Sequence, residues 1–397
     1  MKKLAKEIWI VGAKRTAFGA MVGAFKDRSA VELGVDASRA AIAQSGIEPK
    51  EFDHVILGNV QQTAVDAIFA ARHIGLKCGI PIETPALIVN RLCGSGFQAV
   101  ISAAEQIVLG DAKAVLAVGA ENMTQAPHVL YGLREGAKYA KPPKLLDSLA
   151  EGLVDSFCNA PMAVTAENLA TKYGITREQC DAFALRSQQR WGAAQEAGRF
   201  RDEIVPVEVA QGKKSIVVDK DEHPRPQSTP EILAKLPAIF KKDGVVTAAN
   251  ASGICDGAGA IVLVDAEWGK ARGLKPLARL LQWGISGVEP SIMGIGPAPA
   301  IRSALDRAGV SFASVDLFDV NEAFAAQWLA VQKELELPDE TSNVNGGAIA
   351  LGHPLGASGS RITANLIYTM KASNKSISVG SACIGGGQGI AIVLENL

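Results

Sequence analysis

The chain of 397 residues contains an internal repeat that restricts its possible folds. The stretch 41–60, AIAQSGIEPKEFDHVILGNV, aligns with a stretch that begins 263 residues later, ALDRAGVSFASVDLFDVNEA at 304–323. The same shift places LCGSG at 92–96 on LGASG at 355–359, and the pair Val118-Gly119 recurs 261 residues further on. Three matches in the same order predict two halves of similar structure. Because similar halves pack with equivalent elements together, we expect the two glycine-rich turns to meet at one central site.

Each half has the pattern of an α/β unit. Short apolar, β-branched runs typical of buried strands alternate with stretches whose apolar residues recur at helical spacing. In the first half the predicted strands are 8–11, 55–57, 86–89 and 114–118, and the predicted helices are 30–45, 64–76 and a segment that follows Cys93 and ends near Gly110. Such alternation implies a mostly parallel sheet that is covered on both faces.

The pattern changes between the halves, which suggests three parts, 1–122, 123–272 and 273–397. In the middle part, Thr176 and Gln179 form a capping box that opens a helix running to about Gly198. The segment HPRPQS at 223–228 is predicted to be stiff and extended, since each proline restricts itself and its predecessor. We interpret 123–272 as an inserted loop domain that covers a substrate; an insertion that serves stability alone is the alternative.

Composition excludes several classes of function. The net charge is −1, with 20% charged and 48% hydrophobic residues, which argues against a dedicated nucleic-acid or membrane-surface protein. The six cysteines form no C-x-x-C pair and have no histidine at metal-ligand spacing, so neither a metal site nor a disulfide framework is predicted. The N-terminal apolar run IWIV is too short for a signal peptide or a membrane span. Together these features predict the cytoplasm.

Cys93 is the first candidate for catalysis. It lies between the strand 86–89 and the following helix, at a turn where Gly94 and Gly96 leave room for a substrate and for free backbone amides. A thiol at a helix N-terminus faces the positive end of the helix dipole, which is expected to lower its pKa. The residue is predicted to be a nucleophile, and a small buried apolar residue is the alternative.

Three further polar groups fall in loops where chemistry is expected. His353 lies in the glycine-rich stretch 343–361, where it is a candidate acid or base. Cys383 precedes three consecutive glycines whose backbone amides can act as donors toward an oxyanion. Asn321 follows the strand 317–320, at the strand end where α/β sheets bind ligands.

These residues carry a resemblance to a known family that extends over essentially the whole chain. The chain resembles the thiolases, and within them it is most similar to the degradative 3-ketoacyl-CoA thiolases of fatty-acid β-oxidation. The motifs that carry the resemblance are NRLCGSGFQAV, PMAVTAENLA, VTAANASG, SIMGIGPAPA, DVNEAFAAQ, NVNGGAIALGHPLGASGSR and SACIGGGQG. The resemblance implies a five-layered α/β/α/β/α arrangement of two duplicated halves, which agrees with the repeat.

The resemblance also implies a role for each candidate. Cys93 would become acylated, and His353 would be the base that activates it. Cys383 would be the acid or base at the carbon of acetyl-CoA, and the amides of Cys93 and Gly385 would stabilise the tetrahedral intermediate. His353, together with a water held by Asn321, would stabilise the enolate of acetyl-CoA.

Coenzyme A is implied as a substrate, and no bound cofactor or metal is implied. Arg225 would lie near its nucleotide end, with Ser228, Ser252 and Met162 along its length. The acyl-CoA and CoA substrates are the only small-molecule partners expected, and the family implies a homodimer or homotetramer. The mitochondrial matrix is the alternative to the cytoplasm, because some mitochondrial members keep an uncleaved N-terminus.

Several alternative functions remain at this stage. Short-chain biosynthetic thiolases carry a His-Met pair where this chain has Pro161-Met162, so the smaller residue predicts a roomier acyl pocket; an enzyme specific for acetoacetyl-CoA is the alternative. A ketosynthase-type enzyme would lack the second cysteine, Cys383. A non-catalytic carrier of acyl-CoA or lipid would not need the polar catalytic groups. A nucleotide-dependent dehydrogenase is disfavoured because no G-x-G-x-x-G follows the first strand.

Overall fold

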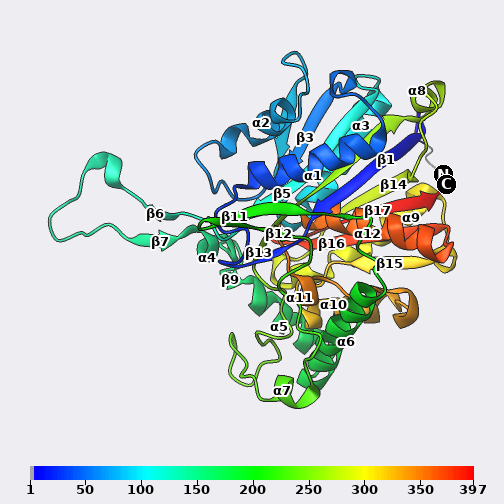
Figure 1. Cartoon of the computed structure of the whole chain (residues 1–397). Coiled ribbons are helices and arrows are strands. Elements are labelled where there is room, and N and C mark those ends of the chain that lie inside the picture. Colours follow the sequence, from blue (N-terminus) through cyan, green and yellow to red (C-terminus); the bar gives the residue numbers. More distant parts are fainter. Residues whose placement is uncertain (1–3) are drawn as a thin grey trace.

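Residues 4–397 are described by a computed structural model, in which an 11-stranded mixed sheet runs through the molecule (Figure 1). Two short strands lie off its main path: β2 (Gly19–Ala20) pairs with β13, and β10 (Ile204–Val205) pairs with β1. The main path follows the order β15 (Leu317–Val320), β16 (Ile377–Ile384), β17 (Gln388–Asn396), β14 (Ala278–Gly287), β1 (Ile8–Thr16), β13 (Cys255–Asp265), β5 (Ala114–Asn122), β3 (His54–Gly58) and β4 (Ala86–Val89). The two halves of the sheet join where Ile8–Ile10 of β1 pair with β14.

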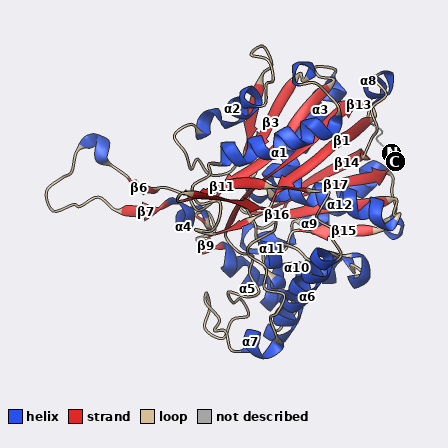
Figure 2. Ribbon diagram, in the orientation of Figure 1, coloured by secondary structure: helices blue, strands red, loops and turns tan. Residues whose placement is uncertain are grey.

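Helices cover both halves of the sheet and also lie between them (Figure 2). The central layer is α3 (Ser95–Leu109) and α12 (Ser358–Ser373), whose apolar side chains share one core with strands of both halves. The outer faces are covered by α1 (Ala30–Ser45) and α2 (Ala70–Lys77) on the first half, and by α9 (Pro297–Ala308) and α10 (Ala325–Leu335) on the second. The five-layered α/β/α/β/α arrangement is therefore confirmed. The prediction of a mostly parallel sheet is wrong, because the middle of the sheet pairs antiparallel and, along the main path, only β3 with β4 and β5, and β15 with β16, pair parallel.

The duplication is confirmed element by element. The pair α1 and β3 recurs as α9 and β15, and α3 and α12 begin at Ser95 and Ser358, which are 263 residues apart. The turns before these two central helices pack backbone against backbone: a Cβ atom on Gly359 would lie 2.1 Å from the Phe97 nitrogen, and one on Gly96 would lie 2.8 Å from the Gly356 carbonyl oxygen. Only glycine permits this approach, so the glycine-rich turns do meet at the centre.

Local sequence signals explain most helix boundaries. Ser29 and Glu32 form a capping box at the start of α1, and Gly46 ends that helix in the left-handed conformation. The predicted capping box of Thr176 and Gln179 is present and opens α6 (Arg177–Glu196). The predicted helix 64–76 begins later than expected, because 59–61 is held in an irregular loop and Ala67–Phe69 forms only a 3₁₀ turn before α2.

The segment between the two halves, called the excursion below, consists mostly of short helices and strands. Its first part is an arm that projects from the body, formed by β6 (His128–Leu130) and β7 (Leu145–Asp147) (Figure 1). It continues through α4 (Ser148–Gly152), β8 (Val154–Asp155), β9 (Ala160–Pro161), α5 (Met162–Tyr173), α6, β11 (Val207–Gln211), β12 (Lys214–Val218) and α7 (Pro230–Ala234). After β13 come α8 (Ala266–Ala271) and, much later, α11 (Ala348–Leu351).

The strand β13 does not belong to this excursion. Although residues 255–265 fall within the range 123–272 predicted as the insertion, they pair with β1 on one side and with β5 on the other. The first half of the sheet is therefore completed by a strand that follows the excursion. The pairing favours an insertion that ends before Cys255 instead of at residue 272.

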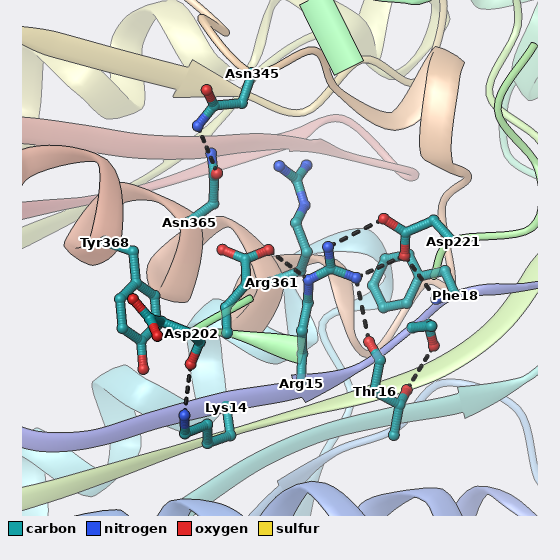
Figure 3. Close-up of polar contacts among 12 residues, drawn as sticks. Lys14, Arg15, Thr16, Phe18, Asp202, Asp221, Asn345, Arg361, Asn365 and Tyr368 are labelled. Atoms are coloured by element: carbon teal, nitrogen blue, oxygen red, sulfur yellow. Dashed lines mark hydrogen bonds and ion pairs between the residues drawn. The ribbon is translucent and has the colours of Figure 1, made fainter. Parts of the chain in front are cut away.

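A buried ion-pair cluster fixes the excursion to the sheet. The Arg15 guanidinium on β1 is inaccessible to solvent and binds Glu203 at 2.7 Å. It also binds Asp221 at 2.6 Å (Figure 3). Removing either carboxylate would leave part of a buried charge unpaired, which is strongly destabilising. Because both carboxylates come from the excursion, this cluster holds the end of the segment that precedes residues 223–228.

One helical stretch within residues 4–397, Leu92–Leu109, is long and apolar enough to cross a membrane by length and composition. In this fold it is α3 with the turn that precedes it, and it lies in the central layer between the two half-sheets. Its apolar character is explained by contacts on both sides of the helix.

Candidate active site

Cys93 lies in a 3₁₀ turn, Leu92–Gly94, between β4 and α3. Side chains hold this turn: Asn90 Oδ1 accepts from the Leu92 amide at 2.9 Å, and Ser95 Oγ donates to the Leu92 carbonyl at 2.7 Å. Leu92 itself has φ of 45°, a left-handed conformation that is energetically costly for any residue other than glycine. Such conformations cluster at functional sites. The turn presents the Cys93 side chain partly exposed, beside the cluster of Met123, Leu149 and Leu355.

The thiol of Cys93 is protonated at neutral pH in this structure. Its pKa is raised to about 11: burial is the main cause, the backbone amides of Gly385 and of Cys93 itself oppose the rise, and the carboxylate of Glu121 adds to it. The predicted lowering of this pKa at the helix N-terminus is therefore wrong, because the loss of hydration outweighs the favourable amides. A base must remove the proton before the sulfur can attack a carbonyl.

His353 is oriented as such a base. Its backbone amide donates to the Gly253 carbonyl at 2.9 Å, and its Nδ1 lies 2.5 Å from Ser358 Oγ. Ser358 Oγ donates to the Pro354 carbonyl at 3.1 Å, so this hydroxyl accepts the proton of Nδ1. The tautomer with Nδ1–H follows, and it leaves a lone pair on Nε2, which faces the Asn321 amide at 3.3 Å.

Electrostatics keep the His353 imidazole neutral. Burial, and to a smaller extent the nearby Arg361 guanidinium, lower its pKa to about 3. Arg361 in turn is paired with the buried carboxylate of Asp319 on β15 at 2.9 Å. The imidazole is therefore an unprotonated acceptor throughout the physiological pH range.

Asn321 and Cys383 come from neighbouring strands of the second half. Asn321 directly follows β15, and its backbone amide donates to the Ser381 carbonyl of β16 at 2.8 Å. Its Oδ1 has no hydrogen-bond partner among the described residues, so it is open to a polar group of a ligand or a water. Cys383 is fully buried in β16, and its pKa is raised by burial and by the proximity of Cys93.

The turn 385–387 brings backbone amides to the sulfur of Cys93. Gly386 and Gly387 have φ of 79° and 83°, a conformation that favours glycine, and Gly385 precedes them at the end of β16. A Cβ on Gly385 would lie 3.2 Å from Met162 Sδ, so a side chain here would crowd the start of α5. This arrangement can polarise a thioester carbonyl at Cys93 through two amides.

The predicted catalytic residues thus converge from both halves. The structure brings Cys93, His353, Asn321, Cys383 and Gly385 together at the contact of the two glycine-rich turns. A neutral imidazole, two thiols and bare amides can support acyl transfer through a covalent thioester.

Comparison with protein families identifies the fold. Residues 8–267 match the family model described as "Thiolase, N-terminal domain", and residues 274–396 match "Thiolase, C-terminal domain". The chain belongs to the thiolase family. Its relatives include the mitochondrial 3-ketoacyl-CoA thiolases of Mus musculus and Homo sapiens, each 52% identical over 393 residues that cover 99% of both chains. An acetyl-CoA acetyltransferase of Pseudomonas aeruginosa is 48% identical over 98% of this chain and 99% of the relative.

Solved structures agree with the family. The crystal structure of human mitochondrial 3-ketoacyl-CoA thiolase superposes with a TM-score of 0.98 at 52% identity, covering 99% of this thiolase and all of that chain. The same human enzyme in complex with CoA gives a TM-score of 0.97, with 100% and 99% coverage. The acetyl-CoA acetyltransferase of Bacillus anthracis gives 0.97 at 43% identity with full coverage of both chains.

Two of the four predicted CoA contacts in this thiolase border a single cavity. Arg225 and Ser228 line it, and Arg225 braces the extended segment by donating to the carbonyls of His223 at 2.7 Å and Pro224 at 2.9 Å. The cavity has a volume of about 250 Å³ and is also lined by Gln188, His223, Ile232, Leu233, Leu236, Ala248, Ala249 and Ile349.

The other two predicted contacts lie closer to the reacting groups. The Ser252 amide donates to the Ala323 carbonyl at 3.0 Å, and the next residue, Gly253, holds the His353 backbone. Met162 begins α5 and packs beside Cys383. Within residues 4–397 no group of three or more His, Cys, Asp or Glu side chains is arranged to hold a metal ion.

Sequence reasoning missed two residues of this site. Ser358, which orients His353, aligns in the repeat with Ser95, which holds the Cys93 turn, so comparison of the halves contained a signal for it. Glu121 carries a fully buried carboxylate between the two turns. No local pattern marks Glu121, because its partners are 60–62 and 235 residues away in the chain.

Proposed function

We propose that this thiolase catalyses the reversible cleavage of a 3-ketoacyl-CoA by CoA, which yields acetyl-CoA and an acyl-CoA shortened by two carbons. The observation that carries the proposal is the neutral His353 imidazole, whose unprotonated Nε2 faces the Asn321 side chain, on a turn in backbone contact with the turn of Cys93. The names of the 52% identical relatives and the CoA complex of the human enzyme support 3-ketoacyl-CoA and CoA as the substrates.

The first half-reaction forms an acyl-enzyme. His353 takes the proton of Cys93, and the thiolate attacks the 3-keto carbon while the amides of Cys93 and Gly385 stabilise the oxyanion. When the oxyanion collapses, the bond between carbons 2 and 3 breaks and the acetyl-CoA enolate leaves. The protonated His353 and a water held by Asn321 stabilise the enolate oxygen, and Cys383 donates its proton to the enolate carbon.

The second half-reaction regenerates the enzyme. The Cys383 thiolate takes the proton of the incoming CoA thiol, and the CoA sulfur attacks the acyl group on Cys93. The shortened acyl-CoA leaves, and Cys93 recovers its proton from His353. The high pKa of Cys383 suits this exchange, since its thiolate is a strong enough base to activate another thiol.

Coenzyme A is proposed to bind as a substrate along the inserted segment, with no bound cofactor required. Arg225 and Ser228 would contact the nucleotide end at the cavity, and Ser252 and Met162 would contact the part nearer to the thiol. This placement is supported by the position of the first pair at the cavity and of the second pair beside His353 and Cys383.

An acetoacetyl-CoA-specific acetyltransferase is the second candidate. It is favoured by the 48% identity to an acetyl-CoA acetyltransferase, and disfavoured by Pro161, which replaces a larger histidine of short-chain enzymes. A carrier of acyl-CoA without turnover is the third candidate, and the presence of every polar catalytic element argues against it.

Thiolysis of 3-ketoacyl-CoA substrates of roughly four to sixteen carbons tests these candidates. The wild type is run beside Cys93→Ala, and intact mass is measured after quenching. Cleavage across chain lengths, with an acyl adduct on the wild type only, supports the proposal. Activity confined to acetoacetyl-CoA moves the assignment to the acetyltransferase, and no cleavage of any substrate favours the carrier.

Assembly and location are part of the proposal. A homodimer or homotetramer is proposed, supported by exposed apolar side chains beside the edge strand β4, among them Phe69, Ile82 and Leu87. Light scattering on the purified chain measures this directly. The cytoplasm is the proposed location, and the mitochondrial matrix is the alternative that the names of the mouse and human relatives favour.

A further inference from the structure

The carboxylate of Glu121 occupies a buried position between the two catalytic turns. Glu121 is the last residue but one of β5, and its side chain is inaccessible to solvent. Oε1 accepts from Asn59 Nδ2 and the Gln61 amide, each at 3.1 Å, and Oε2 accepts from the Val60 amide at 3.1 Å and the Gly356 amide at 2.9 Å. Four donors therefore surround one negative charge, which is an arrangement suited to the ionised form.

These hydrogen bonds join the two halves of the repeat. Asn59, Val60 and Gln61 follow β3 of the first half, whereas Gly356 belongs to the turn of the second half. Gly356 lies three residues after His353 and two before Ser358, whose hydroxyl orients the imidazole. A movement of Gly356 would consequently move the group that fixes the His353 tautomer and direction.

Glu121 is also near enough to the nucleophile to act on it electrostatically. Its charge contributes to raising the pKa of Cys93, so the carboxylate and the sulfur are electrostatically coupled. The turn of His353 and the turn of Cys93 are thus both within reach of one buried group. Neither contact is part of the acyl-transfer steps derived above.

We propose that Glu121 is a positioning residue for thiolysis. Its ionised carboxylate holds the His353 turn in position against the Cys93 turn, and protonation of that carboxylate allows the His353 turn to shift. The inference deepens the proposed function and rests on it. Glu121 acts through His353 and does not touch the substrate.

The surroundings of Glu121 place its protonation in the range of catalysis. The pKa of Glu121 is raised to about 7: burial is the main cause and the carboxylate of Asp256 on β13 adds to it, while the amides of Gln61, Gly356 and Val60 oppose the rise. A protonated carboxyl must donate, and every bonded partner is itself a donor, so at least one of the four hydrogen bonds is lost. The proposal therefore predicts that kcat falls as the pH drops through about 7.

The test compares Glu121→Gln with the wild type between about pH 6 and 8.5, the range that brackets this titration. At pH 8 we expect kcat for thiolysis to fall by about 10- to 100-fold, because a misplaced catalytic group costs rate steeply. The KM for CoA should change less than about twofold, since the cavity lies elsewhere. The ratio of wild-type to variant kcat should decrease toward pH 6, where Glu121 of the wild type is itself protonated. Glu105→Gln, which changes an exposed carboxylate on α3 in the same way, is the control and should leave both values unchanged.

A second variant separates positioning from folding. Asn59→Ala removes one donor to the ionised carboxylate, so the acid limb of the kcat profile should move to higher pH. This variant decides the question where Glu121→Gln does not fold. An acid limb that stays in place in Asn59→Ala, or a Glu121→Gln kcat within about twofold of the wild type at every pH, overturns the inference. A wild type without thiolysis overturns the proposed function and this inference with it.

Discussion

At the scale of single residues, His353 and Glu121 show how burial sets protonation in opposite directions. Loss of hydration disfavours the charged form of each group, so the pKa of His353 is lowered to about 3 and that of Glu121 is raised to about 7. Around pH 8 the pair is a neutral base and an ionised carboxylate, the combination that the proposed mechanism requires. Below pH 7 the carboxylate changes first, while the imidazole stays neutral.

The buried neutral His353 should make the fold sensitive to acid. In the unfolded chain its pKa is near 6.5, so between pH 6.5 and 3 the unfolded state binds a proton that the folded state does not. Stability is therefore lost as pH falls, by about 1 kcal/mol per pH unit. Urea unfolding at pH 6, 5 and 4 should show a steeper decline for the wild type than for His353→Gln, and parallel declines would contradict the assigned pKa.

A single side chain, that of Pro161, is also expected to set the range of acyl chain lengths that the enzyme accepts. It precedes α5 and is followed by Met162, which packs beside Cys383. Pro161→His should reduce kcat/KM for 3-ketooctanoyl-CoA by about tenfold while acetoacetyl-CoA turnover stays within about twofold, since the larger ring fills space beside the acyl group. Pro338→His, at an exposed position, serves as the control. An equal loss on both substrates would exclude this role.

At the scale of elements, the segment 223–228 supplies a braced edge for the proposed CoA cavity. Arg225→Ala removes a cation and the hydrogen bonds to its own loop, so the KM for CoA should rise by about tenfold with kcat changed less than about twofold. Steady-state thiolysis at varied CoA measures both values. Arg72→Ala is the control. It removes similar hydrogen bonds, from Arg72 to the carbonyls of Ile82 and Thr84, outside this cavity, so the KM for CoA should not change. A fall in kcat alone would place Arg225 outside CoA binding.

Local sequence signals predicted the helices and strands more accurately than they predicted which strands pair. The capping box at Thr176 and the helix after Cys93 depend on neighbouring residues, and both were predictable. The place of β13 was not, because it pairs with β1 and β5 across more than a hundred residues of chain. The raised pKa of Cys93 has the same origin: the helix terminus is a local feature, whereas the burial that outweighs it comes from residues distant in sequence.

At the scale of the whole molecule, the repeat explains why the candidate site lies at the centre. The first half contributes Cys93, and the second contributes His353, Asn321 and Cys383, so the set is complete only where the halves dock. The aligned repeat predicted the meeting of the turns, and the local settings of the residues together with the family resemblance predicted the five catalytic candidates. The sequence could not predict Glu121, whose hydrogen bonds come from residues 59–61 of the same half and from Gly356 of the other half, all distant from it in the chain.

The backbone contact between the turns can be tested by adding one carbon atom. In Gly359→Ala the new Cβ would lie 2.1 Å from the Phe97 nitrogen and 2.7 Å from the Gly96 carbonyl carbon, and neither backbone group can move without separating α3 from α12. We expect a loss of at least about 3 kcal/mol in the free energy of unfolding and a collapse of kcat. Gly212→Ala is the control, because Gly212 has φ of 63° with open space around it and should lose only about 1 kcal/mol. Urea midpoints of the two variants give the comparison, and a Gly359→Ala protein as stable as Gly212→Ala would show that the halves are not held together through these turns.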